Sequence, residues 1–160
     1  MEKRTTLFLK TVLIVIGLPI LAFCILVLPS IAKEVLGYHP EYSNFIYVVL
    51  AVMYATAIPF YIALYQSYKL LNFIDANMAF SDLSVNALMN IKKCAYAISL
   101  MYTIIMPFFY ILGEFDDAPG IILIGLVLIF ASLVIAFFAA ILQKLLKDAI
   151  EFKSENDLTV

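Results

Sequence analysis

The chain has 160 residues, a net charge of −2 and a hydrophobic content of 65%. A soluble domain of this size contains roughly 45–50% apolar residues. The composition therefore argues against an ordinary soluble domain. The net charge gives no reason to expect direct binding of nucleic acid, and we predict none.

Four long apolar segments follow one another along the chain, and none contains Asp, Glu, Lys, Arg or His. Each has about 19–24 residues, enough to cross roughly 30 Å of hydrocarbon as a helix. Backbone amides in lipid must bond within their own segment, and the alternation of a barrel strand is missing, so we predict helices. The predicted spans are residues 11–32, 45–68, 94–112 and 120–142.

The basic residues are distributed unevenly around these spans. Nine of the ten precede span one, separate spans two and three, or follow span four, whereas Lys33 falls on the other side. Cytoplasmic loops of membrane proteins carry the excess of Lys and Arg. We therefore predict that both termini are cytoplasmic.

Residues 69–93, between spans two and three, are predicted to form a cytoplasmic helical hairpin with its tip at residues 76–81. Ser81 has the character of an N-cap, and Asp82 places negative charge near the positive end of the following helix. Apolar residues recur at helical spacing in both limbs, so the limbs are expected to dock against each other. These residues are Leu70, Phe73 and Ile74 in the first limb and Val85, Leu88 and Ile91 in the second.

The hairpin supplies the candidate partner-binding residues. Phe80 is interpreted either as a plug that closes the hairpin, which is our prediction, or as an exposed anchor for another protein. The two lysines near the membrane are expected to snorkel to lipid phosphates, with protein binding as the alternative. The candidates are Asn77, Phe80, Ser81, Lys92 and Lys93.

Polar residues recur at seven-residue intervals in spans two and three, and residues seven apart lie nearly on one face of a helix. Because a short hairpin joins these spans, we expect the two stripes to pair, hydroxyl to hydroxyl or hydroxyl to backbone. Such bonds contribute about 0.6 kcal/mol on average in membranes. We predict helix packing; the alternative is the lining of a small polar cavity. The stripe residues are Tyr47, Tyr54, Tyr61, Tyr96, Thr103 and Tyr110.

The sequence contains no motif that indicates catalysis, ion-coupled transport or metal binding. The spans hold no ionisable residue of the kind that proton relays and ion-coupled carriers use. The sequence has no Gly-rich phosphate loop, no Ser–His–Asp set and no HExxH motif. His39, Cys24 and Cys94 match no metal-ligand spacing. We therefore expect no enzyme, catalytic residue, cofactor or metal.

The four spans, and the Phe80-Ser81 pair before an amphipathic helix and a basic pair, resemble a family of small bacterial membrane proteins classified as a domain of unknown function, DUF2975. The resemblance covers nearly the whole chain. A Gly- or Pro-containing turn is common before the Phe in this family, whereas this chain reads Asn-Met-Ala at residues 77–79. Members are often encoded beside a small helix-turn-helix regulator, which implies a regulatory pairing. The family has no known catalytic residues.

We therefore predict an all-α integral membrane four-helix bundle, a single domain over residues 1–160 with a cytoplasmic tail at residues 143–160. The expected location is a bacterial cytoplasmic membrane. The leading hypothesis is a regulatory or interaction module whose hairpin meets a cytoplasmic protein such as a helix-turn-helix regulator. The alternatives are a small transporter or channel component, which could be a homo-oligomer, and a membrane-stress or immunity protein.

Overall fold

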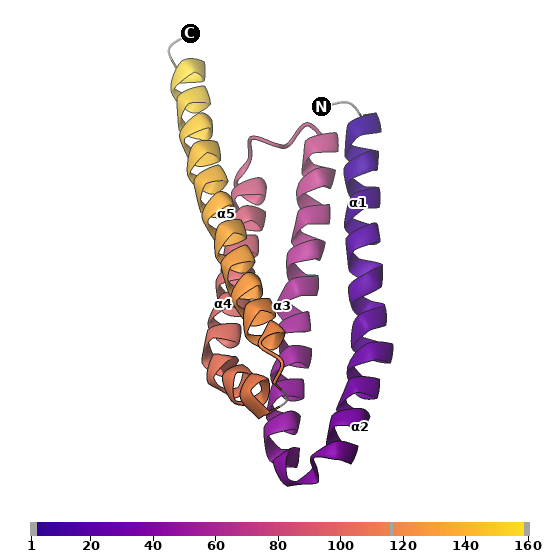
Figure 1. The fold of residues 1–160 in the computed structure, drawn as a ribbon. Coiled ribbons are helices and arrows are strands. Elements are labelled where there is room, and N and C mark those ends of the chain that lie inside the picture. The colour runs from indigo at the N-terminus through magenta and orange to yellow at the C-terminus, as the bar shows by residue number, and fades with distance from the viewer. Residues whose placement is uncertain (1–2, 116, 159–160) are drawn as a thin grey trace.

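The computed structural model describes residues 3–115 and 117–158, and long helices joined by short connections make up almost all of them (Figure 1). These described residues contain no strand, so the predicted all-α class is confirmed. The elements are α1 (Lys3–Ala22), the π-helix η1 (Phe23–Val27), α2 (Leu28–Tyr38), the 3-10 helix η2 (Pro40–Tyr42), α3 (Ser43–Asp75), α4 (Asp82–Phe115) and α5 (Gly120–Leu158).

Four helical stretches are long and apolar enough to cross a membrane. The first is continuous through α1, η1 and α2, and the other three contain α3, α4 and α5. Each stretch contains one of the predicted apolar ranges. With 33, 34 and 39 residues, α3, α4 and α5 measure about 50–58 Å at 1.5 Å per residue. They therefore extend well beyond a hydrocarbon core of roughly 30 Å.

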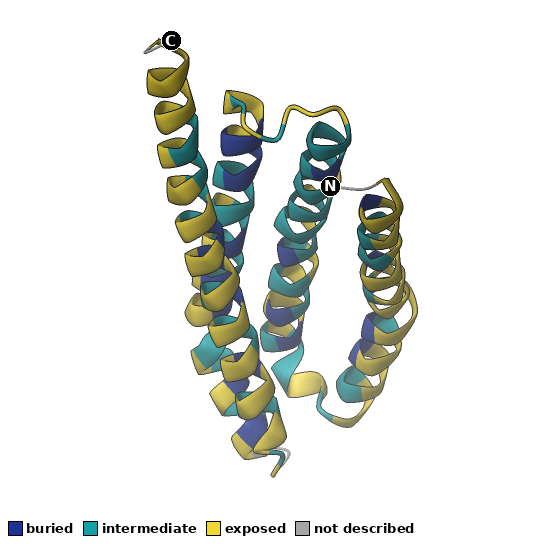
Figure 2. Cartoon of the chain, turned by 90° about the horizontal axis from the view of Figure 1, so that it is seen from above, coloured by how far each residue is buried: buried dark blue, intermediate teal, exposed yellow. Residues whose placement is uncertain are grey.

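The helices pack in a row in the order of the chain. Helix α1 packs on α3, α3 on α4, and α4 on α5 (Figures 1 and 2). The first helix therefore lies at one edge of the row and α5 at the other. In the apolar stretch of span one 11% of residues are buried, against 28% in span three, which places the centre of the packing at α4.

The densest packing lies where α4 contacts α3 on one side and α5 on the other. Ile105, in the second half of α4, is only 1% exposed. At Gly125 of α5, a Cβ atom would lie 2.8 Å from the ring of Phe109 and 2.9 Å from the sulfur of Met106. Glycine is therefore what allows α5 to approach α4 so closely. The core cluster consists of Val49, Tyr102, Ile105 and Phe109.

Span one changes from α-helical to π-helical geometry at η1. The N–H of Leu28 donates to the carbonyl of Phe23, five residues back instead of four. In the same register, the carbonyl of Cys24 would accept from residue 29, but Pro29 has no N–H to donate. The proline therefore leaves a backbone acceptor without a helical partner at the middle of the span.

Both termini and the connection between α3 and α4 lie at the same end of the molecule, at the top in Figure 1. We call this end the terminal end. The connection between α2 and α3 lies at the opposite end. An even number of spans produces this arrangement, as expected from the sequence.

Candidate interaction groove at the terminal end

The tip of the hairpin, residues 76–81, is a defined turn. Asn77 has a φ of 60°, a left-handed conformation that Asn adopts more readily than most residues other than Gly. Its N–H donates to the carbonyl of Ile74 over 3.2 Å, and the N–H of Met78 donates to that of Phe73 over 2.8 Å. These two bonds form the Schellman motif that ends many helices. Asn77 therefore occupies the position where glycine is usual.

The second limb begins where the sequence predicts. The carbonyl of Ser81 accepts the N–H groups of Ser84 and Val85 at 3.1 and 3.3 Å, so Ser81 is the N-cap of α4. Its hydroxyl donates to the carbonyl of Met78 over 2.6 Å, and the hydroxyl of Ser84 donates to the same carbonyl over 3.2 Å. The two serines therefore tie the tip to the first turn of α4.

Phe80 is 58% exposed, so the prediction that its ring plugs the hairpin is wrong. The ring instead borders an apolar groove of about 400 Å³ between the hairpin and α5. We call this hollow the terminal groove. Its lining residues are Leu70, Ile74, Ala79, Phe80, Leu88, Leu142, Leu145, Leu146 and Ala149.

Helix α5 supplies one wall of the terminal groove. Leu142, Leu145, Leu146 and Ala149 follow the i, i+3, i+4, i+7 spacing of one helix face, and all four line the groove. Three of these residues lie within the predicted cytoplasmic tail, residues 143–160, which was not expected to form part of a groove. The leucine spacing was the signal that would have identified it.

Lys92, which is predicted to snorkel to lipid phosphates, also forms a contact within the protein. Its ammonium donates to the side-chain oxygen of Gln143 in α5 over 2.9 Å, and the bond is partly buried. Lys93 is exposed and forms no such hydrogen bond with the described residues. Lys92 therefore joins the second limb of the hairpin to α5 beside the terminal groove.

Two stripe tyrosines of span two bond to span one, so the prediction that they pair with the stripe of span three is wrong. The hydroxyl of Tyr54 donates to the carbonyl of Cys24 over 2.8 Å, and that of Tyr61 donates to the carbonyl of Gly17 over 2.8 Å. The first bond satisfies the acceptor that Pro29 leaves open. The predicted kind of bond, hydroxyl to backbone, is thus present between a different pair of helices.

The stripe residues of span three have other neighbours. Tyr96 packs edge-on against Phe137 of α5, with ring centroids 6.4 Å apart. Thr103 donates to the carbonyl of Ser99 in its own helix over 2.7 Å. Tyr110, like Tyr47 of span two, is exposed.

A buried hydroxyl pair that was not predicted does join spans two and three. The hydroxyl oxygens of Thr56 and Tyr102 lie 3.1 Å apart, and Thr56 also donates to the carbonyl of Met53 over 2.7 Å. Neither residue falls in the seven-residue stripes. The seven-residue spacing shows which polar residues share a helix face. It does not show which neighbouring helix that face contacts.

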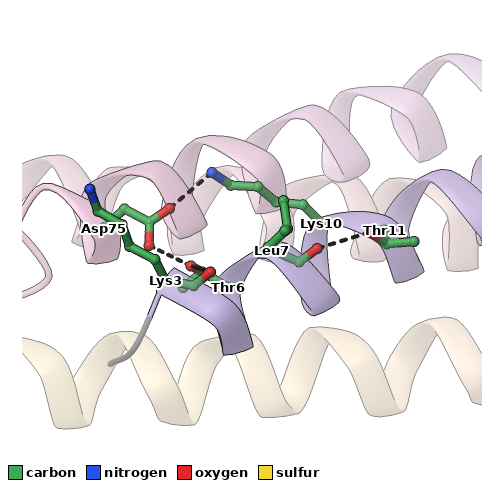
Figure 3. Close-up of polar contacts among 6 residues, drawn as sticks. All are labelled: Lys3, Thr6, Leu7, Lys10, Thr11 and Asp75. Carbon is green, nitrogen blue, oxygen red and sulfur yellow. Dashed lines mark hydrogen bonds and ion pairs between the residues drawn. The ribbon is translucent and has the colours of Figure 1, made fainter.

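A polar cluster joins the start of α1 to the end of α3 at the terminal end (Figure 3). The ammonium of Lys10 lies 3.0 Å from one carboxylate oxygen of Asp75, and the hydroxyl of Thr6 donates to the other. Thr6 is fully buried. The bonds from Thr6 and Lys10, with the charges of Lys10 and Lys3, hold the pKa of Asp75 below its usual value against the opposing effect of desolvation. The cluster fixes the edge helix at one point.

The described residues contain no group of three or more His, Cys, Asp or Glu side chains that could hold a metal ion. Cys24 and Cys94 are both free thiols. The terminal end therefore combines an apolar groove with the polar contacts of Lys92 and Asp75.

Comparison with known proteins gives two matches. The family described as "Protein of unknown function (DUF2975)" matches residues 30–160. A protein of Bacillus subtilis (strain 168), described as the uncharacterized membrane protein YoaS, is 59% identical over 160 residues, which cover all of both chains. No solved structure matches this chain.

Proposed function

Because this chain belongs to the DUF2975 family of membrane proteins, we propose that it is a membrane-anchored interaction module whose terminal groove binds a soluble protein. The proposal places the chain in a bacterial cytoplasmic membrane with the terminal end in the cytoplasm. Nine of the ten basic residues lie on that side of the four spans, and an excess of Lys and Arg marks cytoplasmic segments.

The observation that carries the proposal is the position of the terminal groove relative to the lysines. On α3, Leu70 and Ile74 lie beyond Lys69, away from the apolar span. On α5, Leu145, Leu146 and Ala149 lie beyond Lys144. Phe80 and Leu88 precede Lys92 on the way into span three. Lysine side chains at helix ends mark the membrane interface, so the groove lies on the aqueous side of it.

An apolar groove in water is the usual mark of a binding surface. The terminal groove is walled by helices on both sides, and its Phe80 ring and Leu145 side chain are both more than half exposed. Grooves of this kind bind the apolar face of an amphipathic helix. We therefore propose a helical segment of a cytoplasmic protein as the occupant. A small helix-turn-helix regulator, the partner that the family resemblance implies, could present such a helix.

Photocrosslinking in native membranes tests this proposal. A photoreactive amino acid at position 80 or 145 is expected to capture a discrete protein. The same group at Leu123, an exposed residue within the span of α5, is the matched control and is expected to capture lipid. Capture of lipid alone from positions 80 and 145 would overturn the proposal.

The transporter alternative depends on Tyr54 and Tyr61 lining a water-filled space. Both hydroxyls are instead bonded to carbonyls of span one. The hollow beside the two rings is lined by apolar side chains such as Leu21, Ile25 and Ile58. These contacts support a role in helix packing for both tyrosines.

A further inference from the structure

A second groove, separate from the terminal groove, runs between α1 and α3 within the membrane. It consists of two hollows, of about 640 and 340 Å³. Leu21, Tyr61 and Tyr65 line both, so the two hollows adjoin each other. On span one the lining extends from Lys10 of α1 to Ile25 of η1, a rise of about 22 Å at 1.5 Å per residue. We call this the lateral groove.

The lateral groove exists because polar contacts, and not close apolar packing, hold α1 against α3. Two tyrosine hydroxyls bond to carbonyls of span one at separate heights, that of Gly17 in α1 and that of Cys24 in η1. The Lys10–Asp75 ion pair holds the terminal end. Rings that reach across in this way keep the two backbones apart and leave a trough beside them.

The lateral groove is apolar along most of its length and has lysine side chains at its terminal end. Apolar side chains line nearly all of it. At the terminal end, the ammonium of Lys10 lies 5.3 Å from the ring centre of Tyr68, and that of Lys69 lies 5.3 Å from the ring centre of Tyr65. Lys10 is paired with Asp75, whereas Lys69 forms none of the ion pairs found among the described residues. Lys69, which does not line the hollows itself, therefore places a positive charge beside the Tyr65 ring at this end of the groove.

We propose that the lateral groove binds an acyl chain of an anionic phospholipid, with the phosphate at Lys69. One leaflet contributes roughly 15 Å, half of the hydrocarbon core of roughly 30 Å, so a chain from the leaflet on the terminal side lies within the length of the groove. The tyrosine rings at the mouth match the headgroup level, where Tyr is enriched in membrane proteins. The charge at the mouth selects an anionic headgroup over a zwitterionic one.

This site goes beyond the proposed interaction module and does not depend on it. The lateral groove lies between α1 and α3 along span two, whereas the terminal groove lies between the hairpin and α5. A result on lipid binding therefore neither supports nor contradicts the protein-binding proposal, which the crosslinking experiment tests separately.

Native mass spectrometry of the purified protein tests the lipid site. The protein would be titrated with phosphatidylglycerol and, separately, with phosphatidylcholine carrying the same acyl chains. We expect the wild-type protein to retain phosphatidylglycerol about fivefold more strongly, the effect of roughly one lysine near the headgroup. Lys69→Gln is expected to abolish this preference. Lys147→Gln, which removes an exposed lysine on α5, is the matched control and should preserve it.

A second variant tests the acyl-chain part of the groove. Ala57 lines the wider hollow, and Ala57→Phe is expected to fill it and reduce the retention of both lipids. Because the larger ring could disturb folding, its thermal unfolding in detergent would be measured alongside, and Lys69→Gln tests the site without filling it. Equal retention of phosphatidylglycerol by the wild-type, Lys69→Gln and Lys147→Gln proteins would overturn the proposal.

Discussion

Helices α1 and α5 occupy opposite edges of the same row, yet they are attached to it in different ways. Helix α5 meets α4 at a close apolar contact, where Gly125 lies against Phe109 and Met106. Helix α1 meets α3 through two tyrosine hydroxyls and an ion pair, beside an open groove. We conclude that α3, α4 and α5 form the packed unit that shapes the terminal groove. Helix α1, in contrast, is an edge helix that a few polar contacts hold in place.

The largest effect on stability is expected from a glycine-to-alanine substitution at the α4–α5 contact, compared with the same substitution at the α1–α3 contact. Gly125→Ala places a methyl group within 2.9 Å of Phe109 and Met106, and overpacking of this kind costs about 1–3 kcal/mol. At Gly17, the nearest atom to a new Cβ is the end of the Leu64 side chain at 3.3 Å, which can move aside.

Both glycines are helical, so the gain in helix propensity from alanine is the same and the pair forms a matched comparison. Unfolding in mixed detergent micelles would measure the two free energies. Gly125→Ala should be clearly destabilised and Gly17→Ala close to wild type. Equal destabilisation of the two variants would contradict the contrast between the edges.

A smaller effect is expected at the cluster that fixes α1 at the terminal end. The pKa of Asp75 is lowered by Thr6 and Lys10, so the contribution of its carboxylate is complete above the pKa of an unfolded Asp, about 3.9. That contribution is lost as the pH falls through the lowered pKa of the folded state. Spin labels at Leu7 and Ala76 should show a distance distribution that broadens in this acidic range.

Asp75→Asn provides the control for this prediction. The amide removes the charge that pairs with Lys10 while keeping an oxygen that can accept from Thr6. The variant should therefore show a broadened distribution at neutral pH and no further change on acidification. An unchanged distribution in both proteins at every pH would show that the cluster does not hold α1.

The smallest effect is expected from single hydroxyl groups. Tyr61→Phe and Tyr54→Phe each remove one bond to span one, and such bonds contribute about 0.6 kcal/mol on average in membranes. Tyr54→Phe should cost more of the two, because the carbonyl of Cys24 loses the partner that Pro29 cannot supply. Tyr47→Phe is the control, since that ring is exposed. The same unfolding measurement serves all three variants. If Tyr47→Phe lowered the free energy of unfolding as much as Tyr54→Phe, the stabilising role given to these hydrogen bonds would be contradicted.

Much of the fold follows from the sequence alone. Long uncharged segments predict the four spans, and the Ser81 and Asp82 signals predict the start of α4. The turn at Asn77 could be anticipated because Asn tolerates the left-handed conformation. These features are local, so they depend on residues close together in the chain.

The neighbours of each helix could not be predicted in the same way. The seven-residue spacing shows which tyrosines share a face, but it does not show that Tyr54 and Tyr61 face α1 instead of α4. One signal was available, because a proline in a span frees a carbonyl that some side chain must satisfy. The wall of the terminal groove in α5 was also visible in the spacing of Leu142, Leu145 and Leu146.

Cysteine labelling in intact cells tests most directly whether the terminal groove faces the cytoplasm. Phe80→Cys would be introduced with Cys24→Ser and Cys94→Ser, and a membrane-impermeant maleimide added from outside. Tyr38→Cys, at the opposite end and 76% exposed, reports the other side. The proposal predicts that position 38 reacts in intact cells and that position 80 reacts only after the membrane is permeabilised. Labelling of position 80 in intact cells would place the groove outside and contradict a cytoplasmic partner.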